Sequence, residues 1–297
     1  MKTWCSGQII EGKKQINSLN YSLHYSGPVV WEGIRSYKQD DGSTRVWKLK
    51  EHVQRLKDSA KICGFEIPYT NKQIEDAIEQ LVNANGSGDL YIRPIAYTEM
   101  DAESIHAQVD KIALDIYCRK VPLLHKAGDK GIKMAISGFT RGYPQFQMQA
   151  KTPANYQFVQ LSKAHMKQLG VQDIFVLDNA GHVVEATVSN FWVFKGDVAM
   201  TPPNKGSILP GVTRKCVAEI LQEPGIMVRK YNKAPIVVEK DITKADIYTA
   251  DCVILCGTYA EIVNVLEVDG RKIGSDDTHT YFKILADEYH NLVRGRK

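Results

Sequence analysis

A lysine near the middle of the chain stands in a setting that could support covalent chemistry. The segment Gln149–Tyr156 places Lys151 five residues before Tyr156, at the start of a run whose apolar residues have helical spacing. A lysine amine held away from bulk water can lose its proton, and the neutral amine can then attack an aldehyde to form a Schiff base. The alternative is a solvated surface lysine, and for one of 38 lysines and arginines that alternative is favoured when Lys151 is considered alone.

Six further stretches, in fixed order along the chain, change that balance. They combine basic, acidic and aromatic side chains with glycines, and they are Val30–Arg35, His52–Leu56, Tyr91–Pro94, Gly181–Asn190, Ile208–Arg214 and Cys256–Glu261. Any one of them is a weak signal. Together with the segment around Lys151 they resemble, over nearly the whole chain, the fold type IV pyridoxal-phosphate (PLP) enzymes, and most of all the branched-chain aminotransferases.

The resemblance implies both a fold and an activity. The fold would be mixed α/β (α+β), with the two-domain, D-amino-acid-aminotransferase-like architecture of fold type IV enzymes. The activity would be a transaminase that moves the amino group of a branched-chain or apolar L-amino acid (Leu, Ile or Val) to 2-oxoglutarate, giving the branched 2-oxo acid and glutamate. The resemblance also implies a homodimer or higher homo-oligomer, with the active site near the subunit interface.

Three residues would perform the chemistry on PLP. The resemblance makes Lys151 the Schiff-base lysine, whose amine, once freed by the substrate amine, carries the proton between the substrate α-carbon and the cofactor C4′ carbon. Glu185 would face the pyridine nitrogen, where a carboxylate keeps the ring protonated and improves it as an electron sink. Tyr156 would donate to the phenolate oxygen. Without the resemblance, a solvated glutamate at a strand end is the favoured interpretation of Glu185. For Tyr156, an ordinary core aromatic is then about as good an interpretation as a cofactor contact.

The remaining predicted cofactor contacts hold the phosphate and the ring. A helix predicted to begin near Val212 would offer free backbone N–H groups and the positive end of its dipole to a dianion. The resemblance makes Arg55 the phosphate arginine, and its position beside the apolar stripe of its helix, not opposite it, is compatible with that role. The predicted set is Arg55, Leu209, Gly211, Val212, Thr213 and Thr258.

The resemblance places the substrate contacts on three stretches of chain. Tyr91 and Arg93 share one face of a strand, by its period of two, and they would meet the substrate carboxylates. Two positions depart from the usual pattern of relatives, with Trp31 in place of phenylalanine and Tyr259 in place of alanine. One extra residue lies between Tyr25 and Trp31. The full predicted set is Tyr25, Trp31, Arg35, Tyr91, Arg93, Tyr259 and Ala260.

Two other classes of function remain open at this point. D-amino-acid aminotransferases, (R)-amine aminotransferases and aminodeoxychorismate lyases would share Lys151, Glu185 and the phosphate cradle. The stretches Tyr91–Pro94 and Gly33–Arg35 favour the branched-chain class over these three activities. Trp31 and Tyr259, which depart from the usual branched-chain pattern, are compatible with any of the three. A binding module without activity is the second alternative, and an intact Schiff-base lysine argues against it.

Composition narrows the class of partner. With 297 residues, 43% hydrophobic and 24% charged, the chain has an ordinary globular balance and room for one or two domains. A net charge of +4 without a basic block gives no indication of nucleic-acid binding. The six cysteines fit no zinc spacing, and we expect buried, reduced thiols and no metal. The sequence shows no signal segment and no membrane span, so a cytoplasmic protein without membrane partners is expected.

Hydrophobic periodicity outlines the elements that must position these residues. We expect short strands and turns over 1–37. Helices are expected over 51–63, from Asn71 to before Gly86, and over 155–169, 212–222 and 279–293. Strands are expected at 89–98, 112–118, 132–137, 173–177, 190–195, 226–230, 246–256 and 264–268. A break in the pattern at 121–129 predicts the connection between a small N-terminal domain, 1–120, and a larger PLP-binding domain, 130–297.

Overall fold

The computed structural model of the chain describes residues 1–121, 131–141, 148–223, 235–275 and 280–296. The chain forms two compact units, one of Met1–Pro122 with Ala150–Asn155 and one of Leu123–Gln149 with Tyr156–Lys297. Apart from Val121, the predicted connection at 121–129 lies outside the described residues. The domain boundaries drawn from the sequence therefore stay a prediction.

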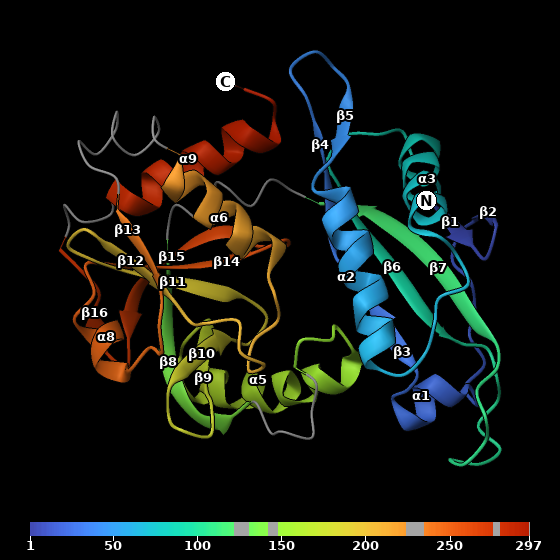
Figure 1. Cartoon of the computed structure of the whole chain (residues 1–297), viewed down its shortest axis with the longest axis horizontal. Helices are drawn as coiled ribbons and strands as arrows, with labels where there is room; N and C mark the ends of the chain where they lie inside the picture. The colour runs from blue at the N-terminus through green and yellow to red at the C-terminus, as the bar shows by residue number, and fades with distance from the viewer. Residues whose placement is uncertain (122–130, 142–147, 224–234, 276–279, 297) are drawn as a thin grey trace. The chain divides into compact units, whose positions relative to one another are not determined.

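The first unit is built on an antiparallel sheet, for which the described residues supply seven strands (Figure 1). Along the sheet the order is β2-β1-β7-β6-β4-β5, and β3 also pairs with β6. The long central strands β6 and β7 pair along their whole length, from Leu90 with Lys120 to Thr98 with Ile112. The strands are β1 Lys2–Cys5, β2 Gln8–Glu11, β3 Val29–Trp31, β4 Ile34–Lys38, β5 Thr44–Val46, β6 Leu90–Thr98 and β7 Ile112–Lys120.

Two amphipathic helices pack on this sheet through one apolar core (Figure 1). α2 spans Leu49–Ile62 and α3 spans Asn71–Ala84. A capping box begins α3, because the Thr70 hydroxyl accepts from the Gln73 N–H and the Gln73 side chain accepts from the Thr70 N–H. α2 also carries His52, which is buried, and Arg55, so this helix positions two of the residues discussed below.

The second unit holds a mixed sheet of nine strands among the described residues. The order is β10-β9-β8-β15-β14-β11-β12-β13, with β16 paired to β15. β8 is parallel to both β9 and β15, and β12 is parallel to β13. The strands are β8 Ile132–Thr140, β9 Asp173–Leu177, β10 Val183–Ala186, β11 Asn190–Lys195, β12 Val198–Thr201, β13 Ile236–Glu239, β14 Cys252–Gly257, β15 Glu261–Val268 and β16 Arg271–Lys272.

Helices of the second unit begin close to the predicted site residues. α6, Val212–Gln222, begins directly after Gly211, and it packs with α9, Thr280–Val293, against β14. The short 3₁₀ helix η1, Pro153–Tyr156, leads into α5, Gln157–Leu169, which lies on β8 and β9. The amphipathic patterns at 155–169 and 212–222 therefore predicted these helices correctly.

Two segments differ from the elements expected from the sequence. The run 246–256 is not one strand, because α8, Lys244–Tyr248, begins with a capping box between Thr243 and Asp246, and β14 begins only at Cys252. Within 1–37 a short helix, α1 Tyr21–Tyr25, is capped by the Asn20 side chain. The expected strand at 226–230 lies outside the described residues.

The described residues also bear on the cysteines and on membrane insertion. All six cysteines are free thiols and five of them are buried. Burial raises the pKa of Cys252 and of Cys256 to about 12, which keeps both protonated and unreactive at neutral pH. No helix in the described part of the chain combines the length and apolar character that crossing a membrane requires.

Candidate functional site

Lys151 is anchored in the first unit by both of its backbone groups. Its N–H donates to the Ser59 hydroxyl at 3.0 Å, and its carbonyl accepts the Trp31 N–H at 3.0 Å. The residue is only 9% exposed, and its amine lies 4.2 Å from the centroid of the Trp31 ring. A solvated surface lysine is therefore wrong for this position. A buried, firmly placed amine beside an aromatic ring fits the role predicted for Lys151.

A buried ion pair joins Arg55 of α2 to Glu32. The guanidinium donates from Nε to Glu32 Oε1 at 2.6 Å and from Nη2 to Glu32 Oε2 at 2.8 Å. Burial alone would raise the pKa of Glu32, but the charge of Arg55 and the hydrogen bonds from His52 and Arg55 hold it well below its usual range. The Arg55 guanidinium thus points toward a buried carboxylate, which fixes its direction.

His52 completes this cluster from the same helix. Its Nδ1 lies 2.9 Å from Glu32 Oε2, and the residue is almost fully buried. Burial lowers the pKa of His52, and the nearby charges of Arg55 and Lys151 add to that effect, while the hydrogen bond to Glu32 opposes it. A neutral imidazole at pH 7 follows, with its Nδ1–H donating to the carboxylate.

The predicted substrate residues of the first unit lie on neighbouring strands. Arg93 Nη2 donates to the Tyr91 hydroxyl at 2.8 Å, which confirms that the two side chains share one face of β6. Arg35 on β4 pairs with Tyr91 in the sheet register and is 1% exposed. A Cβ at Gly33 would collide with the Tyr91 hydroxyl, so glycine leaves room for it. In contrast, Tyr25 on α1 is 38% exposed and packs edge-on against Tyr21.

Glu185 sits within β10, buried, and is held from three directions. Its Oε1 accepts from Asn190 Nδ2 at 2.7 Å and from the Leu209 N–H at 2.8 Å. Its Oε2 accepts a hydrogen bond from Arg141 Nη1, and both side chains are about 4% exposed. A solvated strand-end glutamate is therefore wrong for Glu185. The structure thus shows a buried carboxylate held by three donors, and its predicted role toward a ring nitrogen stays a prediction.

The N-terminus of α6 supplies donors for an anion. Gly211 is its N-cap and no side chain caps the helix, so its first N–H groups, beginning at Val212, have no acceptor within the helix. Thr213 is buried in the first turn. A Cβ at Gly211 would collide with Asn190 Oδ1, because Asn190 also donates to the Leu209 carbonyl at 3.1 Å. Glycine at 211 is thus required by the side chain that also holds Glu185.

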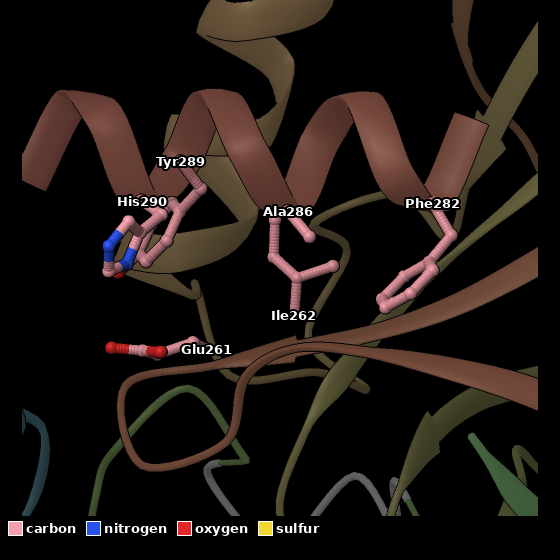
Figure 2. Close-up of a pocket in the computed structure, with 6 residues that line it drawn as sticks. All are labelled: Glu261, Ile262, Phe282, Ala286, Tyr289 and His290. Carbon is pink, nitrogen blue, oxygen red and sulfur yellow. The ribbon is translucent and has the colours of Figure 1, made fainter. Parts of the chain in front are cut away.

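Thr258, Tyr259 and Ala260 form the turn between β14 and β15. Tyr259 is 46% exposed, whereas Glu261, directly after the turn, is 5% exposed with a left-handed φ of 59°. Figure 2 shows the Glu261 side chain at a small cavity below α9, with the ring of His290 pointing toward it. A left-handed non-glycine residue costs roughly 1–3 kcal/mol and persists only where its surroundings fix it. The end of the turn is therefore anchored through Glu261.

Tyr156 is half-buried at the N-cap of α5.

The sequence did not single out five residues that contact predicted site residues, or a partner of one, in the structure. They are Glu32, His52, Ser59, Arg141 and Asn190. Glu32, His52 and Asn190 stand within the stretches quoted above, and a glutamate inside the apolar run Val29–Ile34 was a usable signal, because a charge there must be paired. Ser59 and Arg141 carried no such signal.

Comparison with known proteins agrees with this geometry. Residues 30–268 match the family model of class IV amino-transferases. The branched-chain-amino-acid aminotransferase of Pseudomonas aeruginosa is 31% identical over 99% of this chain and 93% of its own length. The branched-chain aminotransferase of Thermoproteus uzoniensis, solved with norvaline, has a TM-score of 0.89 at 30% identity, over 100% of this chain and 96% of that one. A branched-chain amino acid aminotransferase complexed with N-(5′-phosphopyridoxyl)-L-glutamate, from the organism abbreviated T.th., has a TM-score of 0.88 at 28% identity, over 100% and 95%.

The chain belongs to the class IV aminotransferases. It is a transaminase of fold type IV with PLP as its cofactor. Its residues fit that group: a buried amine for the aldehyde, an oriented carboxylate for the ring nitrogen, and uncapped helix N–H groups with a buried threonine for the phosphate.

Proposed function

We propose that this transaminase is a branched-chain-amino-acid aminotransferase, which uses Leu, Ile or Val as donor and 2-oxoglutarate as acceptor. The observation that carries the proposal is the pairing of an apolar ring with a cation beside the catalytic lysine. Trp31 contacts the Lys151 amine, and Arg93 lies against the same ring. Such a surface can accept an apolar side chain or a carboxylate in turn. Relatives with this name, at about 30% identity over nearly the full chain, support the same substrates.

In this proposal the residues take the following roles. PLP, when bound, supplies the electron sink for the carbanion at the substrate α-carbon. Lys151 takes the proton from that carbon and delivers it to the cofactor C4′ carbon. Glu185 keeps the pyridine nitrogen protonated, and Arg141 and Asn190 orient Glu185. Tyr156 donates to the phenolate oxygen.

We assign the remaining predicted residues to phosphate and substrate. Arg55, Thr213, Thr258 and the N–H groups after Gly211 hold the phosphate, and Leu209 packs on the ring. The backbone of the turn that ends at Ala260 and the Tyr91 hydroxyl bind the α-carboxylate, and Arg93 binds the second carboxylate of glutamate. Tyr25, Trp31, Arg35 and Tyr259 contribute walls of the substrate site.

Two wider aspects of the assignment are proposals as well. A homodimer or higher homo-oligomer, with the active site near the subunit interface, is expected for a chain of this family, and sedimentation of the purified protein tests it. The cytoplasmic location remains a prediction from the sequence.

A panel of amino donors with 2-oxoglutarate tests the function directly. We expect L-leucine, L-isoleucine and L-valine to give glutamate with the highest kcat/KM. D-alanine and (R)-1-phenylethylamine should give at least roughly a hundredfold less, because discrimination of about 3 kcal/mol is within reach of a shaped pocket. Preference for a D-amino acid or an (R)-amine would contradict the proposal in favour of another activity of the same fold.

A further inference from the structure

We propose that Trp31 is a positioning residue that sets selectivity between acidic and apolar substrates, because it holds the guanidinium of Arg93 at a fixed place beside the Lys151 amine. The inference rests on the function proposed above. It concerns residues of the first unit only.

Two cations share the Trp31 ring. Arg93 Cζ lies 4.0 Å from the ring centroid and Lys151 Nζ lies 4.2 Å from it, both within the range of about 6 Å for cation–π attraction. The amine and the guanidinium carbon can therefore be no further apart than these two distances together. The rigid indole of Trp31 thus limits the distance between the Lys151 amine, which reacts with the substrate, and the Arg93 guanidinium.

The strand register explains why these side chains meet. Trp31 on β3 pairs with Ile95 on β6. Arg93 is two residues from Ile95 and so lies diagonally across from Trp31 on the same face, a separation that aromatic and long side chains bridge. The Trp31 N–H also donates to the Lys151 carbonyl at 3.0 Å. The backbone thereby places the ring within reach of both cations.

The Arg93 guanidinium is held by Tyr91, but one of its donors finds no acceptor among the described residues. Its Nη2 donates to the Tyr91 hydroxyl at 2.8 Å, and the Tyr91 ring centroid lies 5.4 Å from Cζ. Its Nε is buried and finds no hydrogen-bond partner within the described part of the chain. A buried donor without a partner costs roughly 1–3 kcal/mol, and a bound carboxylate would remove that cost. The orphaned Nε points to a carboxylate ligand.

The identity of the ring matters to this arrangement. Tryptophan attracts cations most strongly among the aromatic side chains. Phenylalanine would keep an apolar surface for leucine but would hold the guanidinium less well. Exchange of Trp31 for phenylalanine should therefore weaken acidic substrates more than apolar ones.

The test measures binding of two unreactive probes to the holoenzyme by calorimetry. Glutarate stands for the acidic substrate and 4-methylvalerate for the apolar one. In Trp31→Phe we expect glutarate to bind roughly three- to thirtyfold more weakly, and 4-methylvalerate to change less than about twofold. In the Arg93→Met background the same exchange should change glutarate affinity less than about twofold. Trp4→Phe, a buried tryptophan of the same unit, is the matched control and should leave both affinities unchanged.

Three outcomes would overturn the inference. If Trp31→Phe weakens the binding of glutarate and of 4-methylvalerate equally, Trp31 acts only as an apolar surface. If the effects of Trp31→Phe and Arg93→Met on glutarate affinity are independent, the two side chains are not coupled. Wild-type protein that neither binds glutarate nor aminates 2-oxoglutarate would instead overturn the proposed function, and this inference with it. The amination assay separates that result from the other two.

Discussion

The carboxylate of Glu32 holds the guanidinium of Arg55 through two parallel hydrogen bonds of 2.6 and 2.8 Å. Such a bidentate pair fixes the plane of the guanidinium as well as its position. The planar fork uses Nε and Nη2 toward Glu32, so its remaining donors are directed away from that carboxylate. If Arg55 binds the PLP phosphate, Glu32 sets the angle at which it does so.

Glu32→Gln should therefore weaken cofactor binding although Glu32 need not touch the cofactor. An amide cannot accept both guanidinium hydrogen bonds, and Arg55 loses its buried counter-charge. We expect roughly a tenfold to hundredfold loss of PLP affinity, as for one charge-assisted hydrogen bond. PLP titration of the apoenzyme measures it. Glu51→Gln, which breaks a partly exposed pair between the first turn of α2 and its N-cap Lys48, should leave the affinity unchanged. Equal affinities in all three proteins would contradict the role of Glu32.

His52 makes stability depend on pH in a defined direction. Its pKa is lowered by burial in the folded chain, so below its unfolded value of about 6.5 the unfolded chain binds more protons. The free energy of unfolding therefore falls as the pH drops below about 6.5, by at most about 1.4 kcal/mol per pH unit for one proton. Thermal unfolding midpoints at about pH 7.5 and about pH 5.5, one unit on either side of that value, should differ less in His52→Gln than in wild type. The exposed His106→Gln should keep the wild-type difference, and the same difference in all three would refute the assignment.

Glu185→Gln separates cofactor binding from proton abstraction. The amide oxygen can still accept from the Leu209 N–H and the Asn190 side chain, so the local fold should survive. An amide cannot hold the pyridine nitrogen protonated, and the electron sink weakens. We expect PLP to remain bound while the single-turnover rate with leucine falls at least roughly a hundredfold. An unchanged rate would place another group at the ring nitrogen.

Gly211→Ala tests the packing at the start of α6. The new Cβ would collide with Asn190 Oδ1, so Asn190 must move and its hydrogen bonds to Glu185 and Leu209 are disturbed. Loss of stability of about 1–3 kcal/mol is expected, with weaker PLP binding. Gly138→Ala, where a Cβ meets open space, is the control. Equal stability of the two variants in denaturant titration would show that Asn190 gives way freely.

Local patterns predicted the helices better than the remaining structure. Apolar spacing predicted α3, and the run after Gly211 predicted α6, because both signals lie within a few residues. The strand expected at 246–256 is present only from Cys252 on, because the Thr243–Asp246 capping box starts a helix over the first part of that range.

Pairings between distant residues were beyond local patterns. Arg55 and Glu32 are 23 positions apart, and Arg141 and Glu185 are 44 apart. The resemblance indicated that Arg55 and Glu185 matter, but not which charges hold them. Those partners depend on which strands and helices pack together, and the periodicity of the sequence does not predict that packing.

Replacement of Lys151 by alanine, followed by amino transfer from leucine to 2-oxoglutarate, tests the central claim most directly. Loss of the one amine that moves the proton should abolish turnover, by many orders of magnitude, and should remove the visible absorbance of bound cofactor. The fold should persist, since Lys151 is held by its backbone groups. Lys163→Ala, an exposed lysine of α5, should keep full activity. Near-normal transfer in Lys151→Ala would contradict the account, because another lysine would then be the catalyst.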